Sequence, residues 1–280
     1  MLCRGCENMK NRWIPYVKNN GQARMRLFCL PYAGGGASVY WSWRDHIIPE
    51  VELCPVQMPG REGRITEAPL SQIDEIVDRV FENIRSNLDL PYVLFGHSMG
   101  ATVAFELAQR SRQAGERQPL HLFVSGTDAP QLPEREPLIY DLPDADFLRE
   151  LHAVNGGPNP ALQNPELVQL LLPALRADFV AIQTYQYRER APLTCAITAF
   201  GGFDDPYVSA EGLELWREQT VSEFESRQLP GDHFFLHSAR PELLQEINYR
   251  LRARVRDLQS AGTKSHTAVS SSLSSNSIQR

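Results

Sequence analysis

One stretch near the middle of the chain constrains the fold more than any other, because it predicts a buried strand that turns into a helix at a single serine. Residues 92–95 are aromatic, β-branched or aliphatic, as a strand covered on both faces requires. In residues 103–108 the apolar side chains recur at helical spacing. Between the two segments lies Gly96-His97-Ser98-Met99-Gly100, a G-x-S-x-G pattern. A strand, a tight turn and a helix in this order predict an α/β fold.

The residues of this pattern point to a nucleophilic serine. Glycines on both sides allow a strained turn, because β-carbons there would collide with the neighbouring strand and helix. The hydroxyl of Ser98 then stands at a helix N-terminus, where the N–H of Met99 can stabilise negative charge on a substrate oxygen. The alternative, a serine that only caps the helix, does not explain why the motif joins an apolar run to an amphipathic helix.

The rest of the chain alternates between apolar strand patterns and helical patterns. Residues 71–88 have helical spacing and lead into the serine turn. Further strands are expected at residues 25–30, 51–57, 120–126 and 193–200. This β-α-β-α-β order predicts a mostly parallel central sheet with flanking helices.

Three segments interrupt or flank this alternation. Residues 1–24 are polar and are expected to be a disordered leader that contributes little to the core. Residues 128–192 carry helical patterns at 144–154 and 165 to about 187, which predict a helical lid over the site, the alternative being helices that only pack. The main domain is expected to span 25–258, its last helix running from 241 to about 258, and the serine-rich residues 259–280 are expected to be a disordered tail.

Composition excludes several classes of function. The formal net charge of -6, without a clustered basic stripe, argues against a nucleic acid or an anionic membrane as the main partner. Neither a signal-peptide apolar core nor a membrane-spanning apolar run is found, so we expect a cytoplasmic protein. A monomer is the default expectation. Small substrates or protein partners remain.

The cysteines do not predict a metal site. Cys29, Cys54 and Cys195 lie in apolar strand-like runs and are expected to be reduced core residues. Cys3 and Cys6 have the spacing of half a zinc site, but no second pair accompanies them, so we interpret them as part of the leader.

The glycine-rich loop after the first strand, Pro31-Tyr32-Ala33-Gly34-Gly35-Gly36, matches neither phosphate-binding spacing, G-x-x-x-x-G-K-[ST] or G-x-G-x-x-G. A serine enzyme of this kind needs a second backbone N–H for its oxyanion hole, supplied by the loop after an early strand. Ala33 is the expected donor, with Gly34 as the next choice.

An activated serine also needs a base and an orienting carboxylate, which follow it in the order serine, acid, histidine. His233 lies in a loop after the last strand and is the expected base, whereas His237, four residues later, is expected to pack or cap. His97 is expected to pack beneath the turn, because adjacent strand residues point to opposite faces. Asp204 and Asp205 both follow the strand that ends near residue 200, and spacing alone leaves the choice between them open.

Two arginines follow the second strand in a Pro-Gly turn. Arg61 and Arg64 are expected near the carboxyl end of that strand, where open α/β sheets bind ligands. They are candidates for binding an anionic group of a substrate or partner, and the alternative is that they are solvated loop residues.

Several of these motifs together resemble one known family. They are Pro31-Tyr32-Ala33-Gly34-Gly35, Pro59-Gly60-Arg61, the serine turn, Gly202-Phe203-Asp204-Asp205-Pro206-Tyr207-Val208, Trp216 and Pro230-Gly231-Asp232-His233-Phe234-Phe235-Leu236. Over roughly residues 25–250 the chain looks like the type II (external, editing) thioesterases of nonribosomal peptide and polyketide synthases.

The resemblance implies an α/β-hydrolase fold with a helical lid. It also implies a Ser98-Asp205-His233 triad, because the acid of the family pattern lies three residues after the glycine. The substrate would be an acyl or aminoacyl thioester on the phosphopantetheine arm of a carrier protein, with no cofactor held by the enzyme itself. The competing interpretations are a medium-chain fatty-acyl thioesterase, a carboxylesterase or a lipase on the same fold, and a non-catalytic module that binds carrier proteins.

Overall fold

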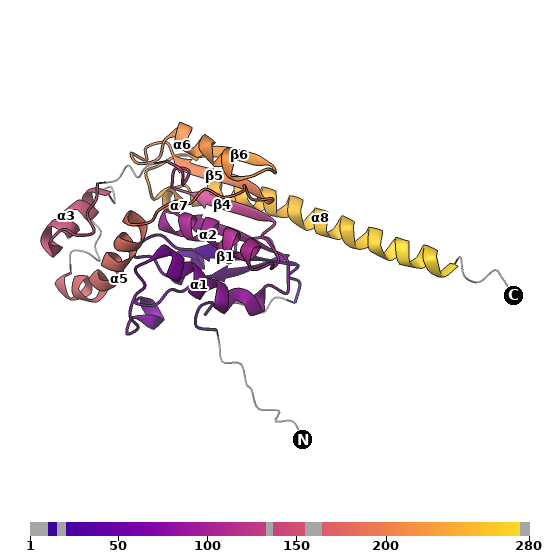
Figure 1. Cartoon of the computed structure of the whole chain (residues 1–280), viewed down its shortest axis with the longest axis horizontal. Coiled ribbons are helices and arrows are strands. Elements are labelled where there is room, and N and C mark those ends of the chain that lie inside the picture. Colours follow the sequence, from indigo (N-terminus) through magenta and orange to yellow (C-terminus); the bar gives the residue numbers. More distant parts are fainter. Residues whose placement is uncertain (1–10, 16–20, 133–136, 155–163, 275–280) are drawn as a thin grey trace, which may run out of the picture.

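All strands of the sheet run parallel. The computed structural model describes residues 11–15, 21–132, 137–154 and 164–274 of the chain (Figure 1). Within them, one six-stranded sheet has the order β2-β1-β3-β4-β5-β6, and every neighbouring pair is parallel. The strands are β1 (Met25–Leu30), β2 (Val51–Pro55), β3 (Tyr92–His97), β4 (His121–Ser125), β5 (Ala196–Gly202) and β6 (Phe224–Leu229). The predicted parallel sheet is confirmed.

Helices cover both faces of this sheet. Besides two single turns, η2 (Glu62–Arg64) and η3 (Arg85–Asn87), the helices of the described residues, including two that do not cover the sheet, are η1 (Ala37–Trp43), α1 (Ile73–Ile84), α2 (Met99–Gln113), α3 (Asp144–Val154), α5 (Pro165–Gln183), α6 (Ala210–Glu214), η4 (Leu215–Gln219), α7 (Phe235–Ser238) and α8 (Arg240–Ser274). Leu94 of β3 faces the core formed with α1 and α2, and its neighbours Val93 and Phe95 face the core formed with η1 and α8. This alternation explains why the strands are apolar on both sides.

The strand order creates a switch point beside β3. From β1 the chain moves outward to β2 and then returns to the other side of β1 to form β3. The loops that follow β1 and β3 therefore leave the sheet in opposite directions, and such a crevice at the carboxyl ends of the strands is where open α/β sheets bind ligands. The turn at Ser98 lies at this point.

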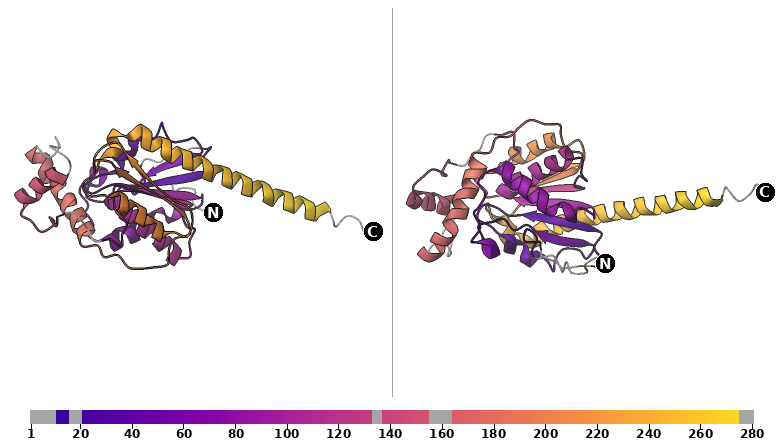
Figure 2. Two further views of the ribbon diagram at one scale, coloured as in Figure 1. Left: turned by 90° about the horizontal axis from the view of Figure 1, so that it is seen from above. Right: turned by 60° about the horizontal axis from the view of Figure 1, so that its bottom comes forward.

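Helices α3 and α5 stand beyond the carboxyl ends of the strands, apart from the helices that cover the sheet (Figures 1 and 2). They have a small core of their own, made of Ile139, Phe147, Leu151, Leu175 and Phe179. The helix expected at 144–154 has those bounds, and the second one ends at Gln183 rather than near residue 187. Both helices of the expected lid segment are present.

The leader differs from the prediction where it is described. Trp13 and Ile14 are buried in the core with α1. The carbonyl of Trp13 accepts a hydrogen bond of 2.8 Å from the N–H of Gln57. The guanidinium of Arg64 lies 4.3 Å from the centre of the Trp13 ring. The expectation that this segment contributes little to the core is therefore wrong for residues 11–15. Cys3 and Cys6 lie outside the described residues.

The carboxyl-terminal helix is longer than expected. Instead of ending near residue 258, α8 continues to Ser274, through most of the segment expected to be disordered. Its second half extends away from the sheet (Figures 1 and 2). The serine-rich composition was therefore misleading as far as residue 274.

Two other expectations concern the cysteines and membrane-spanning helices. Cys29, Cys54 and Cys195 are buried free thiols, as predicted. No helix within the described ranges combines the length and the apolar character needed to cross a membrane.

Candidate active site

Ser98 has a strained backbone conformation at the end of β3. Its φ of 52° and ψ of -124° lie outside the regions that L-residues favour. The turn is held by a hydrogen bond of 2.7 Å from the N–H of Ser98 to the carbonyl of Ser125. The side chain is half-buried, and the residue directly precedes α2. The hydroxyl thus stands at a helix N-terminus.

The two glycines of the motif are required by backbone contacts. A β-carbon on Gly96 would lie 2.0 Å from the carbonyl oxygen of Gly100, and one on Gly100 would lie 2.2 Å from that of Leu30. Neither neighbour is a flexible side chain that could move away. Leu30 ends β1, so the close approach at Gly100 also brings the serine turn against the start of the glycine-rich loop.

A histidine and an aspartate from two other loops form a buried pair. Nδ1 of His233 lies 2.8 Å from Oδ2 of Asp205, and the other carboxylate oxygen accepts a hydrogen bond of 3.0 Å from the N–H of Tyr207. Both side chains are buried. A carboxylate on Nδ1 fixes the tautomer in which Nε2 is the basic nitrogen. Asp204, the other candidate acid, is exposed, and the structure brings Asp205 to the imidazole.

Close packing of the two loops explains how this pair forms. A β-carbon on Gly202 would lie 2.5 Å from the carbonyl oxygens of Gly231 and Asp232. The N–H of Asp204 also donates to the carbonyl of Gly231 at 3.0 Å. The loops after β5 and β6 therefore lie against each other, with the acid and the histidine on facing segments.

His97 lies beneath the serine turn. It is fully buried, its Nδ1 lies 2.9 Å from the hydroxyl of Ser125, and its ring centre is 5.3 Å from that of His233. Burial, followed by the charge of His233, lowers the pKa of His97 well below the ordinary value for histidine. His97 is thus a neutral packing partner of the histidine in the pair.

His237 occupies a packing position as well. Its Nε2 lies 3.1 Å from the hydroxyl of Tyr32, and its ring stacks on that of Phe234. Burial, and secondarily the charge of Arg240, lowers its pKa. Tyr32 belongs to the glycine-rich loop, so His237 connects that loop to α7.

The glycine-rich loop forms a tight turn from Tyr32 to Gly35. The N–H of Gly35 donates to the carbonyl of Tyr32 at 2.9 Å, and Gly34 has a φ of 77°. The N–H of Gly34, the second choice for an oxyanion donor, is bound at 2.7 Å by Oδ2 of Asp178 on α5. Ala33 therefore remains the candidate donor of this loop, beside Met99 at the start of α2.

The prediction for the two arginines does not fit their positions. Arg61 and Arg64 are almost completely buried, with exposed fractions of 2% and 7%. The guanidinium of Arg61 binds both oxygens of Asp178, at 2.6 and 2.9 Å, and that of Arg64 binds Glu67 at 2.6 Å. Carboxylates of the chain itself thus pair with both guanidinium groups, whose charges would otherwise be costly to bury. They are structural residues rather than a binding surface.

Asp178 was not identified from the sequence. It is fully buried on α5, in a stretch whose neighbours Leu175 and Phe179 belong to the small core of α3 and α5. A carboxylate among apolar side chains is a signal that it has a buried partner, but the pattern does not say which one.

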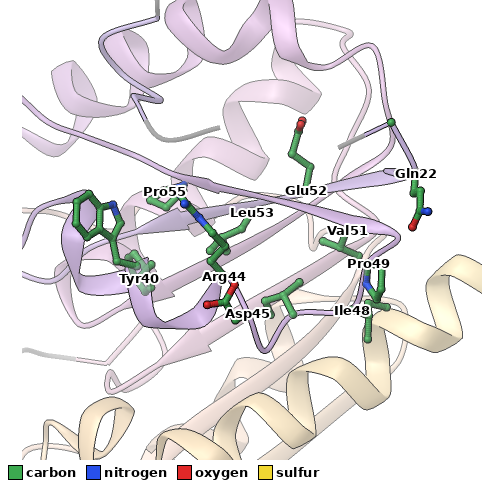
Figure 3. A pocket seen from close by; sticks show the side chains of 13 residues that line it. Gln22, Tyr40, Arg44, Asp45, Ile48, Pro49, Val51, Glu52, Leu53 and Pro55 are labelled. Carbon is green, nitrogen blue, oxygen red and sulfur yellow. The ribbon is translucent and has the colours of Figure 1, made fainter. Parts of the chain in front are cut away.

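The described residues contain no group of histidine, cysteine and carboxylate side chains that could hold a metal ion. A pocket of about 490 Å³ lies elsewhere, between η1 and the edge strand β2 (Figure 3). Its lining includes Tyr40, Arg44, Asp45 and Glu52, and neither Ser98 nor His233. The residues predicted to be catalytic therefore do not line this pocket.

Residues 25–251 match the model of the Thioesterase domain family. The chain is 46% identical over 242 residues to the gramicidin S biosynthesis protein GrsT of Aneurinibacillus migulanus, covering 86% of this chain and 94% of that protein. Its fold is similar to that of the type II thioesterase BorB from the borrelidin biosynthetic cluster, with a TM-score of 0.78, 35% identity and coverage of 88% and 100%. It is also similar to ClbQ from the colibactin NRPS/PKS pathway, with a TM-score of 0.79, 29% identity and coverage of 82% and 98%.

Proposed function

The chain belongs to the thioesterase domain family, and from this premise we propose that it removes aberrant or stalled acyl groups from the carrier proteins of a nonribosomal peptide or polyketide synthase. The family membership makes it a thioester hydrolase of the α/β-hydrolase fold. The biosynthetic setting is carried over from GrsT, BorB and ClbQ, whose names place them in such pathways. The observation that supports the chemistry best is the buried Asp205–His233 pair beside a strained serine turn.

In the proposed reaction Ser98 attacks the thioester carbonyl while His233 takes its proton. Asp205 holds the imidazole in the required tautomer and stabilises the imidazolium that forms. The N–H groups of Met99 and Ala33 bind the oxyanion of the tetrahedral intermediate, and a thiolate leaves. Water then repeats the sequence on the acyl-serine.

The leaving group determines where the imidazole is needed most. A thiol with a pKa of about 8.5 leaves with less acid assistance than an alcohol or an amine does. Deprotonation of Ser98 is therefore the main task of His233. The phosphopantetheine arm belongs to the substrate in this scheme, and the enzyme contributes only its own side chains and backbone.

The partner in this proposal is a carrier-protein domain, and the enzyme acts on it as a monomer. The cytoplasm is the proposed compartment, which the buried free thiols Cys29, Cys54 and Cys195 support, because unpaired cysteines are typical of reducing compartments. Helix α5 of the proposed lid has two exposed apolar side chains, Leu167 and Leu170.

Mass spectrometry of a carrier protein loaded with different acyl groups tests the proposal. The wild-type chain should return the carrier to its free thiol form, and Ser98→Ala should leave the acyl group in place. Faster hydrolysis of p-nitrophenyl esters than of carrier-bound thioesters would instead indicate a carboxylesterase. Failure of a fluorophosphonate to label Ser98 would indicate a non-catalytic binding module.

A further inference from the structure

The lid helix α5 makes a polar contact with the loop proposed to hold the oxyanion. Asp178 of α5 is fully buried, and its Oδ2 accepts a hydrogen bond of 2.7 Å from the N–H of Gly34. Leu175, one helical turn earlier, packs so closely on Gly34 that a β-carbon there would lie 2.4 Å from its Cδ2. One face of the helix thus rests directly on the loop.

The conformation of this loop depends on the orientation of one peptide group. The turn from Tyr32 to Gly35 has the closing hydrogen bond and the positive φ at Gly34 that define a type II turn, and Ala33 has no positive φ. Type I and type II turns differ mainly in the direction of their central peptide, which here joins Ala33 to Gly34. If this peptide turned over, the carbonyl oxygen of Ala33 would face the carboxylate of Asp178 in place of an N–H. Asp178 therefore favours the type II form.

Arg61 holds the carboxylate in place. Its guanidinium binds both oxygens of Asp178, and it also donates to the carbonyls of Gly35 at 3.3 Å and Pro59 at 3.2 Å. The planar group thereby joins the lid helix to the loops after β1 and β2. A bidentate contact of this kind fixes direction as well as distance.

We propose that Asp178 is a positioning residue for the oxyanion hole, acting through the N–H of Gly34 on the turn that carries Ala33. The proposal rests on the assignment of Ser98 and Ala33 made above. The N–H of Ala33 lies in the peptide that precedes the central one, and the two peptides share the Cα of Ala33, so a turn anchored by Asp178 keeps that N–H in place. The hole is then fully formed only while α5 rests on the loop, and the lid contributes to the chemical step as well as to substrate enclosure.

Such a role predicts a loss in turnover with little change in substrate binding. Oxyanion contacts are stronger in the transition state than in the ground state, so weakening them lowers kcat and leaves KM nearly unchanged. Removal of a whole oxyanion donor costs about 10²- to 10³-fold in kcat. A misplaced donor should cost less, roughly 10- to 100-fold.

A pair of double variants isolates the acceptor for Gly34. Arg61→Met with Asp178→Leu removes both buried charges together, which avoids an uncompensated ion and leaves the Gly34 N–H without an acceptor. Arg61→Met with Asp178→Asn also removes both charges but keeps an amide oxygen for that N–H. With octanoyl-N-acetylcysteamine as substrate, the leucine variant should lose roughly 10- to 100-fold in kcat, and the asparagine variant should stay within about threefold of the wild type.

An inhibitor that forms an oxyanion gives a readout that a purely structural role would not change. The affinity for 3-octylthio-1,1,1-trifluoropropan-2-one, which adds to the serine, should fall in the leucine variant by about the same factor as kcat/KM. Tyr185→Phe is the matched control, because it removes a hydrogen bond of 2.6 Å that joins the segment after α5 to Glu106 of α2 and not to the turn. Tyr185→Phe should leave both kcat/KM and the affinity for the inhibitor unchanged. Equal kcat and inhibitor affinity in the two double variants, with both folded by circular dichroism, would overturn the proposal.

The proposed function can fail separately. A wild-type chain that does not hydrolyse thioesters would refute that function, and the rate at which a fluorophosphonate labels Ser98 would then replace kcat. Labelling also builds charge on an oxygen in the hole, so it should slow in the leucine variant and not in the asparagine variant. The same rate in both variants would again refute the role of Asp178.

Discussion

Nδ1 of His233 lies 2.8 Å from Oδ2 of Asp205, and both side chains are buried at the carboxyl edge of the sheet. The second oxygen of the carboxylate is held by the N–H of Tyr207. Both oxygens therefore have a donor before any substrate arrives, and the imidazole has a fixed orientation. The adjacent Asp204 has the same chemistry but is exposed, so position alone separates the two aspartates.

Asp205→Asn should lower kcat by about 10³- to 10⁴-fold, because an amide at this position favours the wrong tautomer of His233. Asp204→Asn is the matched control and should stay within about twofold of the wild type. Steady-state hydrolysis of a carrier-bound acyl thioester measures both. A normal rate for Asp205→Asn together with an inactive Asp204→Asn would reverse the assignment.

The sheet and the serine turn could be predicted because their signals are local. Residues 92–95 are apolar on both faces, and the glycines at 96 and 100 are needed within a single turn. His233 could be proposed as the base because its position after the last strand leaves few competitors, and the structure pairs it with Asp205. Asp205 could not be separated from Asp204 by spacing, since burial decides between them.

The buried ion pair could not be predicted, because its partners are 117 residues apart in the chain. Arg61 lies in a turn with the composition of an exposed loop, and only the fold shows that α5 covers it. Trp13 and Ile14 were missed because residues 1–24 are polar as a whole, and these two buried side chains do not change that composition. The length of α8 was missed because serine-rich composition says little about a helix that continues from a well-packed start.

Gly100→Ala should abolish activity and destabilise the fold. The new β-carbon would lie 2.2 Å from the carbonyl oxygen of Leu30 and 2.6 Å from that of Pro31, and both are backbone atoms that cannot move without displacing the loop. Gly63→Ala is the control, since a β-carbon there has no atom within 4 Å. Thermal unfolding and thioester hydrolysis should separate the two variants. A Gly100→Ala protein with normal Tm and kcat would contradict the turn geometry.

The unfolding free energy should decrease as the pH falls below about 7. Burial lowers the pKa of His97 and of His121 well below 6.5, with the nearby charges of Arg254 and Arg250 adding to the effect at His121. In the unfolded chain these imidazoles take up protons as the pH falls through about 6.5, whereas in the folded chain they stay neutral to a lower pH. The unfolded state then binds more protons than the folded state does. Each of the two histidines therefore lowers the unfolding free energy by up to about 1.4 kcal/mol for every unit by which the pH falls.

Urea unfolding of a His121 variant can test the contribution of one imidazole. His121→Leu combined with Thr198→Val removes the histidine and the hydroxyl that lies 2.9 Å from its Nε2. Between pH 6.5 and 5 its stability should fall less steeply than that of the wild type, by up to about 1.4 kcal/mol per pH unit. Thr198→Val alone keeps the imidazole and should keep the wild-type slope. Identical slopes in all three proteins would show that burial does not lower the pKa of His121.

A chain that ends after Ser260 should fold and turn over substrate as the full chain does. In the described side chains of α8 the last buried one is Val255, preceded by Leu251, Ile247, Leu244 and Leu243. These apolar contacts stabilise the helix against the sheet, and the exposed Ser260 adds none. Leu251→Ala in the full-length chain, by contrast, should cost about 2–5 kcal/mol, since a fully buried leucine is truncated. Thermal unfolding should show a Tm within about 2 °C of the wild type for the shortened chain and a clear decrease for Leu251→Ala. A large decrease for the shortened chain would mean that residues beyond 260 contribute to the core, and the helix would then be part of the fold along its whole length.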